Sequence, residues 1–568
     1  MEIEKITEQY QRWCKNVTLD KDLVQELRNM AHTPAQIEDA FYCDLEFGTG
    51  GLRGVIGAGT NRMNTYTVAK ASQGIADYVK KNFAPEKWRI AISYDSRIKS
   101  DVFSKKAAEV FSANGIYVSI YNELMPTPCL SYAVRRLGCA AGIMVTASHN
   151  PSKYNGYKVY GADGCQITTK AAEDIFAEIQ KLDIFNDVKV MDFNRGMNIG
   201  LISWIGEEVY IDFIEAVKKQ SVLFGDEVDK SVSIVYSPLN GTGLKPVLHI
   251  LKESGYSNIC VVSEQEQPDG HFPTCPYPNP EIREAMSLGM EYASRCGAEL
   301  LLATDPDCDR VGIAVKDAGG EMILLSGNET GILLLDFICS QRLKHHAMPD
   351  NPVMVKTVVT IDMAERIAKK YGVRTINVLT GFKFIGEQIG KLENRGKESS
   401  FIFGFEESYG YLSGEYVRDK DAVGGAFLIC EMFAYYKSRG ISLLDRLNAI
   451  YSEYGYCLNT LHSYEFEGSI GFERMRSIMA GFRSGITHIG FSKVEEECDY
   501  LKGLDDLPAS NVLKFLLDGN CSVIIRPSGT EPKLKVYISV NADSRAEAMR
   551  MEAEISEAMC RCIGDDGK

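Results

Sequence analysis

The sequence lacks the features that mark membrane, secreted and nucleic-acid-binding proteins. No apolar run approaches the roughly 18 residues that a helix needs to cross a bilayer. The first residues, Met1 to Lys5, are polar and acidic, without the apolar core of a signal peptide. Basic residues are in deficit, and the formal net charge is −15, whereas a nucleic-acid-binding surface needs a basic face. We therefore expect a cytoplasmic protein without a membrane or nucleic-acid partner.

Cysteine is present but lacks the spacing of a metal or disulfide framework. The chain has 16 cysteines, and no two of them form a Cys-x-x-Cys motif. Cys560 and Cys562 are too close together for the usual zinc spacing. We interpret the cysteines as reduced thiols, many of them buried. The sequence also contains no low-complexity segment.

What is present is a long chain of ordinary globular composition. Its 568 residues, 45% of them hydrophobic, correspond to about three to five domains. The first 45 residues are predicted to be helical, because Leu23, Leu27 and Met30 recur at helical spacing. Farther on, short runs rich in Val and Ile, such as 89–94 and 299–303, alternate with amphipathic segments. This alternation is typical of βαβ units.

Four apolar strand-like runs end in polar loops, at Ser148, Asp305, Glu406 and Arg526. Because the loops are about a domain length apart, we predict an α/β protein of four domains. Three are α/β domains with mixed or parallel sheets, and the last is an α+β domain with an antiparallel strand pair at 522–525 and 534–538. The predicted domains span 1–200, with the N-terminal helical extension, then 201–320, 321–440 and 441–568.

The first of these loops places a hydroxyl, Ser148, directly after the apolar run 141–145. In open α/β sheets, ligand sites gather at such strand ends, and the Asn150-Pro151 pair favours a turn. Ser148 is a candidate nucleophile or phosphate carrier; the alternative is a serine that only makes a turn. Neighbouring side chains of an extended loop point apart, so we expect no direct contact between Ser148 and His149. A positioning or proton-transfer role remains open for His149.

The second loop carries three carboxylates at alternating positions, Asp305, Asp307 and Asp309. In an extended loop alternate side chains point to one side, so the three would repel one another without a cation. Oxygen ligands suit Mg²⁺ or Mn²⁺. The alternative is a solvated acidic turn, and an EF-hand is excluded because its glycine and its last glutamate are absent.

The remaining loops offer groups that bind anions and hydroxyls. The last one is a candidate phosphate cradle, although a hairpin turn has the same composition; its residues are Arg526, Ser528, Gly529, Thr530 and Lys533. Glu406 and Ser408 could accept and donate hydrogen bonds to sugar hydroxyls, or belong to a surface loop.

Three further cations are candidates for a role in the site. Lys158 and Lys420 could move protons if other cations lower their pKa, although most lysines are simply exposed. The glycine-rich segment 47–54 does not have the spacing of a dinucleotide-binding loop. We interpret it as a flexible loop that carries Arg53 toward an anion.

Taken together, these motifs resemble the α-D-phosphohexomutase family, which includes phosphoglucomutases and phosphomannomutases. The resemblance covers nearly the whole chain, and Thr380-Gly381-Phe382-Lys383 and Gly404-Phe405-Glu406-Glu407 look most like the phosphoglucomutase-2-type branch. Six motifs carry it in family order: 48–53, 146–151, 155–158, 305–310, 406–408 and 526–533.

The resemblance implies four domains around a central active-site cleft. Ser148 would carry the phosphoryl group and bind the metal together with Asp305, Asp307 and Asp309. The remaining implied roles are as follows: His149, Lys158, Lys420 and Arg53 in catalysis; Glu406 and Ser408 at the sugar; Gly381, Lys383 and Arg310 in substrate binding; and Arg526, Ser528, Gly529, Thr530 and Lys533 at the phosphate that does not react.

The implied reaction interconverts glucose 1-phosphate and glucose 6-phosphate through a phosphoserine. One Mg²⁺ per subunit and glucose 1,6-bisphosphate, as intermediate and activator, would be the cofactors. The partners would be small sugar phosphates, and the chain would be a monomer or a homodimer. Mannose and pentose phosphates stay open as substrates, and a metal-dependent sugar phosphatase or a non-catalytic sugar-phosphate sensor stays open as a different class.

Two positions depart from the family pattern. Cys308 stands where glycine or alanine is common, and a thiol beside the metal could make the site sensitive to oxidation. Asn240 stands where histidine is common, and we expect little consequence.

Overall fold

The computed structural model describes residues 3–48, 50–466, 468–504, 507–527 and 533–564. These residues divide into two compact units. Unit 1 contains the described residues up to Ser326, together with Phe382–Gly404 and Ser408–Tyr435. Unit 2 contains Gly327–Gly381, Phe405–Glu407 and the described residues from Tyr436 onward.

Three amphipathic helices begin the described chain: α1 (Ile3–Asn16), α2 (Lys21–Met30) and α3 (Pro34–Phe41). Trp13 is fully buried among them. Its ring packs edge-on against Phe41 and also contacts Tyr66 of the following helix. The apolar residues singled out in the sequence lie in the same core: Leu23, Leu27 and Met30. The predicted helical start of the chain is therefore confirmed.

The first sheet, in unit 1, has the strand order β1-β2-β6-β5-β3-β4-β7. Strands β3, β4, β5 and β7 are parallel, whereas β6, β2 and β1 continue the sheet in antiparallel fashion. Its strands are β1 (Phe47–Gly48), β2 (Gly51–Val55), β3 (Arg89–Tyr94), β4 (Tyr117–Ile120), β5 (Ala141–Val145), β6 (Tyr154–Gly161) and β7 (Ile202–Trp204). Its helices are α4 (Thr65–Asn82), α5 (Ser100–Ala113), α6 (Thr127–Arg136), α7 (Thr169–Gln180) and α8 (Phe193–Asn198).

The second sheet, also in unit 1, has the order β12-β11-β10-β8-β9. Strands β8, β9 and β10 are parallel, and β11 and β12 are antiparallel additions. Its strands are β8 (Ile234–Ser237), β9 (Ile259–Val261), β10 (Leu300–Thr304), β11 (Val311–Lys316) and β12 (Met322–Leu325). Its helices are α9 (Glu207–Lys218), α10 (Leu244–Glu253), α11 (Ser263–Glu266) and α12 (Arg283–Cys296).

The third sheet has the order β14-β13-β15-β16, and β13 and β14 are parallel. Its strands are β13 (Val353–Thr357), β14 (Arg374–Val378), β15 (Phe401–Glu406) and β16 (Gly410–Leu412). The helices of this part of the chain are α13 (Gly327–Lys344), α14 (Met363–Lys370), α15 (Phe382–Glu393), α16 (Ala422–Lys437) and α17 (Leu443–Tyr454).

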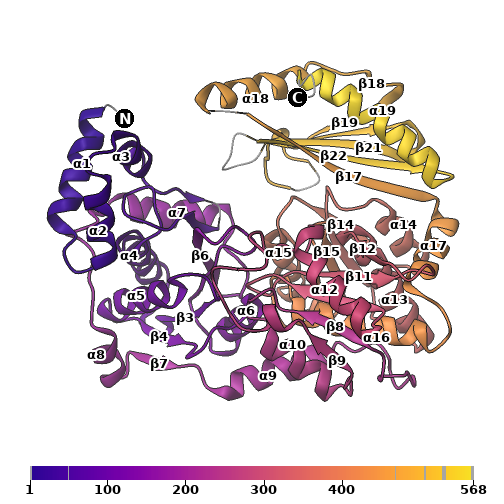
Figure 1. Ribbon diagram of the computed structural model, residues 1–568, viewed down its shortest axis with the longest axis horizontal. Helices are drawn as coiled ribbons and strands as arrows, with labels where there is room; N and C mark the ends of the chain where they lie inside the picture. The colour runs from indigo at the N-terminus through magenta and orange to yellow at the C-terminus, as the bar shows by residue number, and fades with distance from the viewer. Residues whose placement is uncertain (1–2, 49, 467, 505–506, 528–532, 565–568) are drawn as a thin grey trace. The chain divides into compact units, whose positions relative to one another are not determined.

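The C-terminal sheet, in unit 2, has the order β17-β22-β21-β20-β19-β18, with all neighbours antiparallel. Helices α18 (Gly468–Phe482) and α19 (Arg545–Ile563) accompany it, coloured orange and yellow in Figure 1. Apolar side chains of both helices pack on the sheet, among them Met479 and Met559. Its strands are β17 (Tyr456–Glu465), β18 (His488–Ile489), β19 (Ser492–Asp499), β20 (Leu513–Leu517), β21 (Cys521–Pro527) and β22 (Lys533–Ala542).

The predicted fold class is confirmed. Three sheets are mixed or parallel and are accompanied by helices, and the last is antiparallel, with the expected β21–β22 pair. The predicted strand over 89–94 is β3, and the run 141–145 is β5. Among the described residues, no helix combines the length and the apolar character that crossing a membrane requires.

Glu431 on α16 is a carboxyl buried within unit 1. It accepts hydrogen bonds from Ser221 Oγ and from Val222 N, the latter at 3.1 Å. Burial nevertheless raises the pKa of Glu431 to about 7, because the charged form is desolvated. A carboxyl with a pKa raised by folding stabilises the fold fully below its unfolded pKa. That contribution is lost as the pH rises through the folded value.

Replacing this carboxyl should change how stability depends on pH. Glu431→Gln keeps an acceptor for Val222 N and can donate to the Ser221 hydroxyl, but it does not ionise. Between about pH 5 and pH 8 we expect wild type to lose stability relative to the variant, on the order of 2 kcal/mol. Thermal unfolding across this pH range measures the effect. The exposed Glu291→Gln should follow wild type, and parallel pH profiles for all three proteins would contradict the prediction.

Candidate active site and metal centre

Ser148 lies in a tight turn that follows strand β5. Its backbone φ is 51°, in the left-handed region that non-glycine residues seldom adopt. Thr146 Oγ1 stabilises the turn by accepting a hydrogen bond from Ser148 N at 2.8 Å and donating one to Asp95 at 2.6 Å. Gly156 on β6 approaches so closely that a Cβ there would lie 2.4 Å from Thr146 O. Glycine at 156 therefore lets β6 pass beside the turn.

A buried arginine, Arg97, holds the carbonyl oxygens of this turn. Its guanidinium nitrogens donate to four backbone carbonyls, those of Ser148, Asn150, Pro151 and Tyr154. The Asp95 carboxylate lies 3.5 Å from Arg97 Nε, and the Phe272 ring lies below the guanidinium at 5.1 Å. Hydrogen bonds from a charged donor are stronger than neutral ones, so Arg97 offsets the strain of the left-handed residue.

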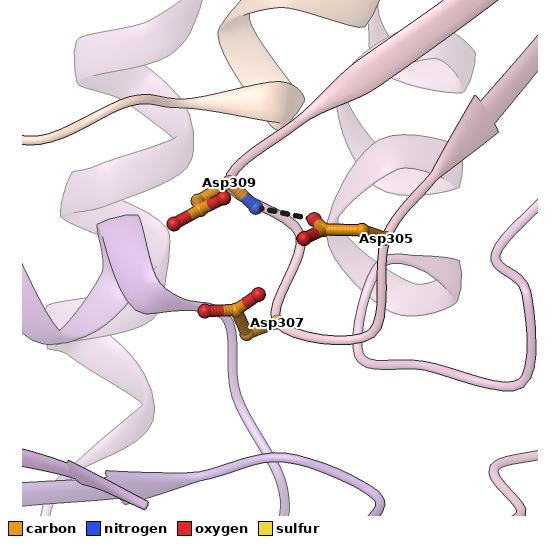
Figure 2. Close-up of side chains that lie close together, drawn as sticks. All are labelled: Asp305, Asp307 and Asp309. Carbon is orange, nitrogen blue, oxygen red and sulfur yellow. Dashed lines mark hydrogen bonds between the residues drawn. The ribbon is translucent and has the colours of Figure 1, made fainter. Parts of the chain in front are cut away.

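The three aspartates follow strand β10 in a second tight turn, shown in Figure 2. Asp305 O accepts from Cys308 N at 2.9 Å, and Asp305 Oδ1 accepts from Asp309 N at 3.1 Å. Cys308 has φ 51°. The expected extended loop is therefore wrong, because these bonds curl the backbone around Asp305. The curl itself brings the three side chains together, each offering one oxygen within 4.8 Å of the others.

The serine turn and the aspartate turn meet directly. Ser148 Oγ donates to Asp305 Oδ2 at 2.9 Å, although 157 positions separate the two residues. Thr127, in the first turn of α6, donates to Asp307 Oδ2 at 2.9 Å. The first two sheets thus present their strand-end loops to one another within unit 1. All four side chains that the sequence assigned to the metal lie in one buried cluster.

Both candidate lysines contact this cluster. Lys158 Nζ, on β6, lies 2.7 Å from Asp307 Oδ2 and 3.3 Å from Asp309 Oδ2. Lys420 Nζ lies 3.2 Å from the same Asp309 oxygen and 3.2 Å from Asp419. Tyr160 orients Asp419 by donating a hydrogen bond at 2.7 Å. The two ammonium groups therefore converge on one carboxylate oxygen of Asp309.

The protonation of the aspartates follows from burial and these partners. Burial raises the pKa of Asp305 well above its ordinary value, and the neighbouring Asp307 and Asp309 raise it further. Burial also opposes ionisation of Asp307, but Lys158 outweighs it and holds the pKa of Asp307 below its usual range. Burial lowers the pKa of Lys158, but the charges of Asp307 and Asp309 together have a larger effect in the opposite direction, so the pKa of Lys158 is raised. Lys158 is therefore an ammonium ion at neutral pH.

The donor set fits a hard divalent cation. The Oδ1 atoms of Asp307 and Asp309 are buried and have no hydrogen-bond partner among the described residues. Buried polar atoms normally have such a partner, and those that do not require an explanation. Three clustered carboxylates and a serine oxygen provide the oxygen-only ligands that Mg²⁺ and similar ions take. The cluster is therefore capable of binding a metal.

His149 contacts Ser148 after all. His149 Nδ1 lies 3.2 Å from Ser148 Oγ, so the expectation that neighbouring side chains point apart is wrong here. The reason is the left-handed backbone at Ser148, which turns both side chains to one side. Burial, followed by the cations Arg310 and Arg53, lowers the pKa of His149 well below its ordinary value. The imidazole is neutral and can exchange a hydrogen bond with the serine hydroxyl.

Two arginines flank the centre. Arg310 Nη1, directly after the aspartate turn, pairs with Glu281 at 2.6 Å. Arg53 is exposed and donates to Asn150 Oδ1 at 3.3 Å. The predicted flexible loop around Arg53 is wrong, because Gly51–Val55 form strand β2, which pairs with β6. Arg53 is therefore presented by a sheet strand beside the serine turn; Thr49 lies outside the described residues.

Lys383 and Ser408 also belong to unit 1. Lys383 lies in the first turn of α15, half-buried, and burial lowers its pKa. Ser408 follows β15, and the next residue, Tyr409, accepts a hydrogen bond from Val311 N at 3.1 Å. That bond ties the Ser408 segment to the strand that leaves the aspartate turn.

The remaining candidates lie in unit 2. Gly381 has φ 112°, a conformation that favours glycine. Glu406 ends β15 and is 6% exposed. Arg526 Nε, near the end of β21, lies 3.4 Å from Tyr537 Oη, and Lys533 begins β22 and pairs with Glu465 at 2.8 Å. Ser528, Gly529 and Thr530 lie outside the described residues.

Sequence reasoning missed the groups that support the serine turn. Asp95 and Arg97 follow β3, the strand next to β5, in the segment Tyr94-Asp95-Ser96-Arg97. An apolar strand that ends in a carboxylate and an arginine is the same signal that identified the other loops. Thr127 and Tyr160 carried no such signal, because single hydroxyls in a helix or strand are common.

The two residues that depart from the family pattern, Cys308 and Asn240, both have structural surroundings that explain them. Cys308 is fully buried, and burial raises the pKa of its thiol well above the ordinary value. The reactive thiolate is therefore scarce. Asn240 has φ 56°, which asparagine tolerates better than most residues. Its side-chain amide donates to the carbonyls of Glu264 and Gln267, at 3.3 and 2.8 Å.

Metal binding should depend on the aspartate oxygens that have no hydrogen-bond partner among the described residues. In Asp307→Asn one carboxylate is replaced by a neutral amide, which weakens a hard-cation site and also breaks the pairing with Lys158. We expect the Kd for Mn²⁺, measured by electron paramagnetic resonance titration, to rise at least about tenfold. Glu291→Gln, an exposed change on α12, is the control. Equal Mn²⁺ affinity in the two variants would contradict a metal at this cluster.

Family models cover most of the chain. Those described as phosphoglucomutase/phosphomannomutase alpha/beta/alpha domains I, II and III match residues 44–184, 208–320 and 326–454. The model of the C-terminal domain matches residues 492–558.

Relatives and solved structures agree with these matches. The phosphoglucomutase of Staphylococcus saprophyticus is 34% identical over 544 residues, 94% of this chain and 96% of that protein. That of Staphylococcus aureus MRSA252 is 36% identical over 546 residues, 92% and 96% of the two chains. Among solved structures, the Paramecium phosphoglucomutase pp63/parafusin shares the fold, with a TM-score of 0.72 at 18% identity over 92% of this chain and 96% of that chain. A putative phosphomannomutase from Thermus thermophilus also shares the fold, with a TM-score of 0.67 at 20% identity over 90% of this chain and 98% of that chain. The chain therefore belongs to the phosphoglucomutase/phosphomannomutase family.

Proposed function

We propose that this protein is a phosphoglucomutase, which interconverts glucose 1-phosphate and glucose 6-phosphate through a phosphoserine at position 148. The observation that carries the proposal is the hydrogen bond of 2.9 Å from Ser148 Oγ to Asp305. It joins a hydroxyl on a fixed turn to a buried cluster capable of holding a metal. The curated relatives that match nearly the whole chain are named phosphoglucomutase.

In the proposed cycle, phosphorylated Ser148 gives its phosphoryl group to the free hydroxyl of a sugar monophosphate. Glucose 1,6-bisphosphate forms and reverses its orientation in the site. It then returns its other phosphoryl group to Ser148. Phosphoryl transfer needs in-line positioning and charge stabilisation more than covalent chemistry. Arg97 supplies positioning, because it fixes the turn that aims the serine oxygen.

Electrostatic stabilisation comes from cations around the serine. Mg²⁺, when bound by Asp305, Asp307 and Asp309 with the Ser148 oxygen, would neutralise charge on the phosphoryl oxygens. Lys158 is held as an ammonium ion and can donate a hydrogen bond to the sugar oxygen, or a proton when that oxygen leaves phosphorus as Ser148 takes a phosphoryl group back. Lys420 presents a second ammonium group at the same aspartate.

His149 fits a proton role at the serine. Its neutral imidazole lies 3.2 Å from Ser148 Oγ and can accept the serine proton when the hydroxyl attacks a phosphate. Arg53, beside the turn, would bind the incoming phosphate, and Arg310 would add positive charge near the metal.

We assign the recognition of the sugar and its second phosphate to the other loops. Glu406 and Ser408 would hold sugar hydroxyls, and Gly381 and Lys383 would add further contacts to the substrate. The phosphate that does not react would be bound by the C-terminal loop residues Arg526, Ser528, Gly529, Thr530 and Lys533. Separate recognition of the two ends lets one substrate bind in two orientations.

The four domains would be bounded near residues 200, 320 and 440. One Mg²⁺ would bind per subunit, of a monomer or homodimer. The 16 cysteines, none of them in a disulfide in this structure, are consistent with a cytoplasmic location.

A substrate panel tests the reaction. Glucose, mannose and ribose 1-phosphates are supplied with Mg²⁺, with and without glucose 1,6-bisphosphate, and products are resolved by ³¹P NMR. We expect glucose 6-phosphate to form fastest and the bisphosphate to stimulate it. Release of inorganic phosphate without isomerised product would indicate a phosphatase instead, and absence of turnover with every sugar would refute a mutase.

The identity of the phosphoryl carrier is tested by mass. After incubation with glucose 1,6-bisphosphate and then dialysis, wild type should gain one phosphate by intact-protein mass spectrometry, and Ser148→Ala should gain none. The variant should also lose turnover by about a thousandfold or more, because the nucleophile is gone. Ser152→Ala, in the same loop, should keep both properties. Phosphate on Ser148→Ala would identify another carrier.

A further inference from the structure

Two cysteines of the second sheet's domain lie close enough to react with each other. Cys296 Sγ lies 3.2 Å from Cys260 Sγ, although 36 positions separate them in the chain. Cys260 is the middle residue of β9, the edge strand of the sheet, and Cys296 is the last residue of α12. The pair therefore joins a sheet edge to the end of a helix.

The two thiols differ in exposure in a way that suits stepwise oxidation. Cys296 is exposed, whereas Cys260 is half-buried and packs against the apolar core beneath α12. Burial, and after it the neighbouring Cys296, raise the pKa of Cys260 to about 11. Cys296 is thus the thiol that an oxidant in solution reaches first, and Cys260 stands behind it as a resolving thiol.

We propose that Cys260 and Cys296 form a reversible disulfide when the protein meets a peroxide. The Cys296 thiol is oxidised by hydrogen peroxide to a sulfenic acid, and one water is released. The Cys260 sulfur then attacks the Cys296 sulfur, which forms the S–S bond and releases a second water. In total, two thiols and one peroxide give one disulfide and two waters, and a dithiol such as reduced thioredoxin or dithiothreitol reverses the reaction. The sulfur atoms need to approach by only about 1 Å to reach bonding distance.

The cross-link would close a segment that supports the serine turn. Between the two cysteines, Phe272 packs under the Arg97 guanidinium, and Glu281 pairs with Arg310. Gly270 lies so close to the Arg97 segment that a Cβ there would come within 2.5 Å of Ile98 N. A covalent bond between the ends of the segment would restrict its excursions in partly unfolded states. We therefore expect the oxidised form to resist proteolysis within 261–295.

The proposal is tested on the whole purified protein with dilute hydrogen peroxide. Non-reducing peptide mass spectrometry should show one cross-linked pair of peptides, containing Cys260 and Cys296, with a mass lower by two hydrogen atoms than that of the two reduced peptides. Dithiothreitol should restore both thiols to iodoacetamide labelling. Limited proteolysis should cut the 261–295 segment several-fold more slowly in the oxidised form than in the reduced form.

Matched variants separate this pair from general thiol oxidation. Cys296→Ser should abolish the cross-link and the proteolytic protection, whereas Cys14→Ser, another exposed position, should change neither. Since serine at an exposed helix end is a mild change, far-ultraviolet circular dichroism should match wild type. The proposal is overturned if Cys296 in wild type accumulates only as sulfenic or sulfinic acid, or if Cys260 stays fully labelled by iodoacetamide after oxidation. It is also overturned if the proteolytic protection persists in Cys296→Ser.

Discussion

The interaction on which the centre depends is the mutual repulsion of three buried carboxylates. Two unit charges about 4 Å apart repel by about 4 kcal/mol at an effective dielectric constant near 20, so Asp305, Asp307 and Asp309 cannot all be ionised without compensation. Lys158 and Lys420 supply part of it, while two carboxylate oxygens keep no hydrogen-bond partner among the described residues. The negative charge of the cluster is therefore only partly balanced by the lysines, as expected of a site that binds a metal cation.

The same constraint explains the surroundings of the centre. Carboxylates curled around a short turn need backbone amides, and Asp305 takes those of Asp309 and Arg310. The serine that donates to Asp305 must leave its own strand in a left-handed conformation, and Arg97 makes that conformation tolerable by binding the carbonyls of the turn. The position of the Ser148 hydroxyl therefore depends on Arg97, a buried cation. Its hydrogen bonds to the backbone of the turn offset the strain of the left-handed conformation.

Much of the fold was predictable because its signals are local. Strands β3, β5 and β10 are short apolar runs that end where polar residues begin, and the antiparallel β21–β22 pair follows from two such runs around a turn. The predictions failed where backbone dihedrals depart from the extended default. Both the aspartate loop and the serine turn were assumed to be extended, and the left-handed residues at Cys308 and Ser148 reversed the expected directions of the side chains. Arg53 was predicted to lie in a loop because the segment around it is rich in glycine, which is uncommon in strands, although Gly51–Val55 form strand β2.

The sequence by itself determined which residue types stand at the strand ends: a serine, three aspartates, and an arginine in the last domain. It did so because strand length and termination depend on neighbouring residues along the chain. Only the tertiary structure decided that Ser148 meets Asp305, that two lysines share one oxygen of Asp309, and that Arg97 supports the turn. Those contacts join residues from separate sheets or strands, and they depend on how the elements pack and on dihedral angles that no local pattern records.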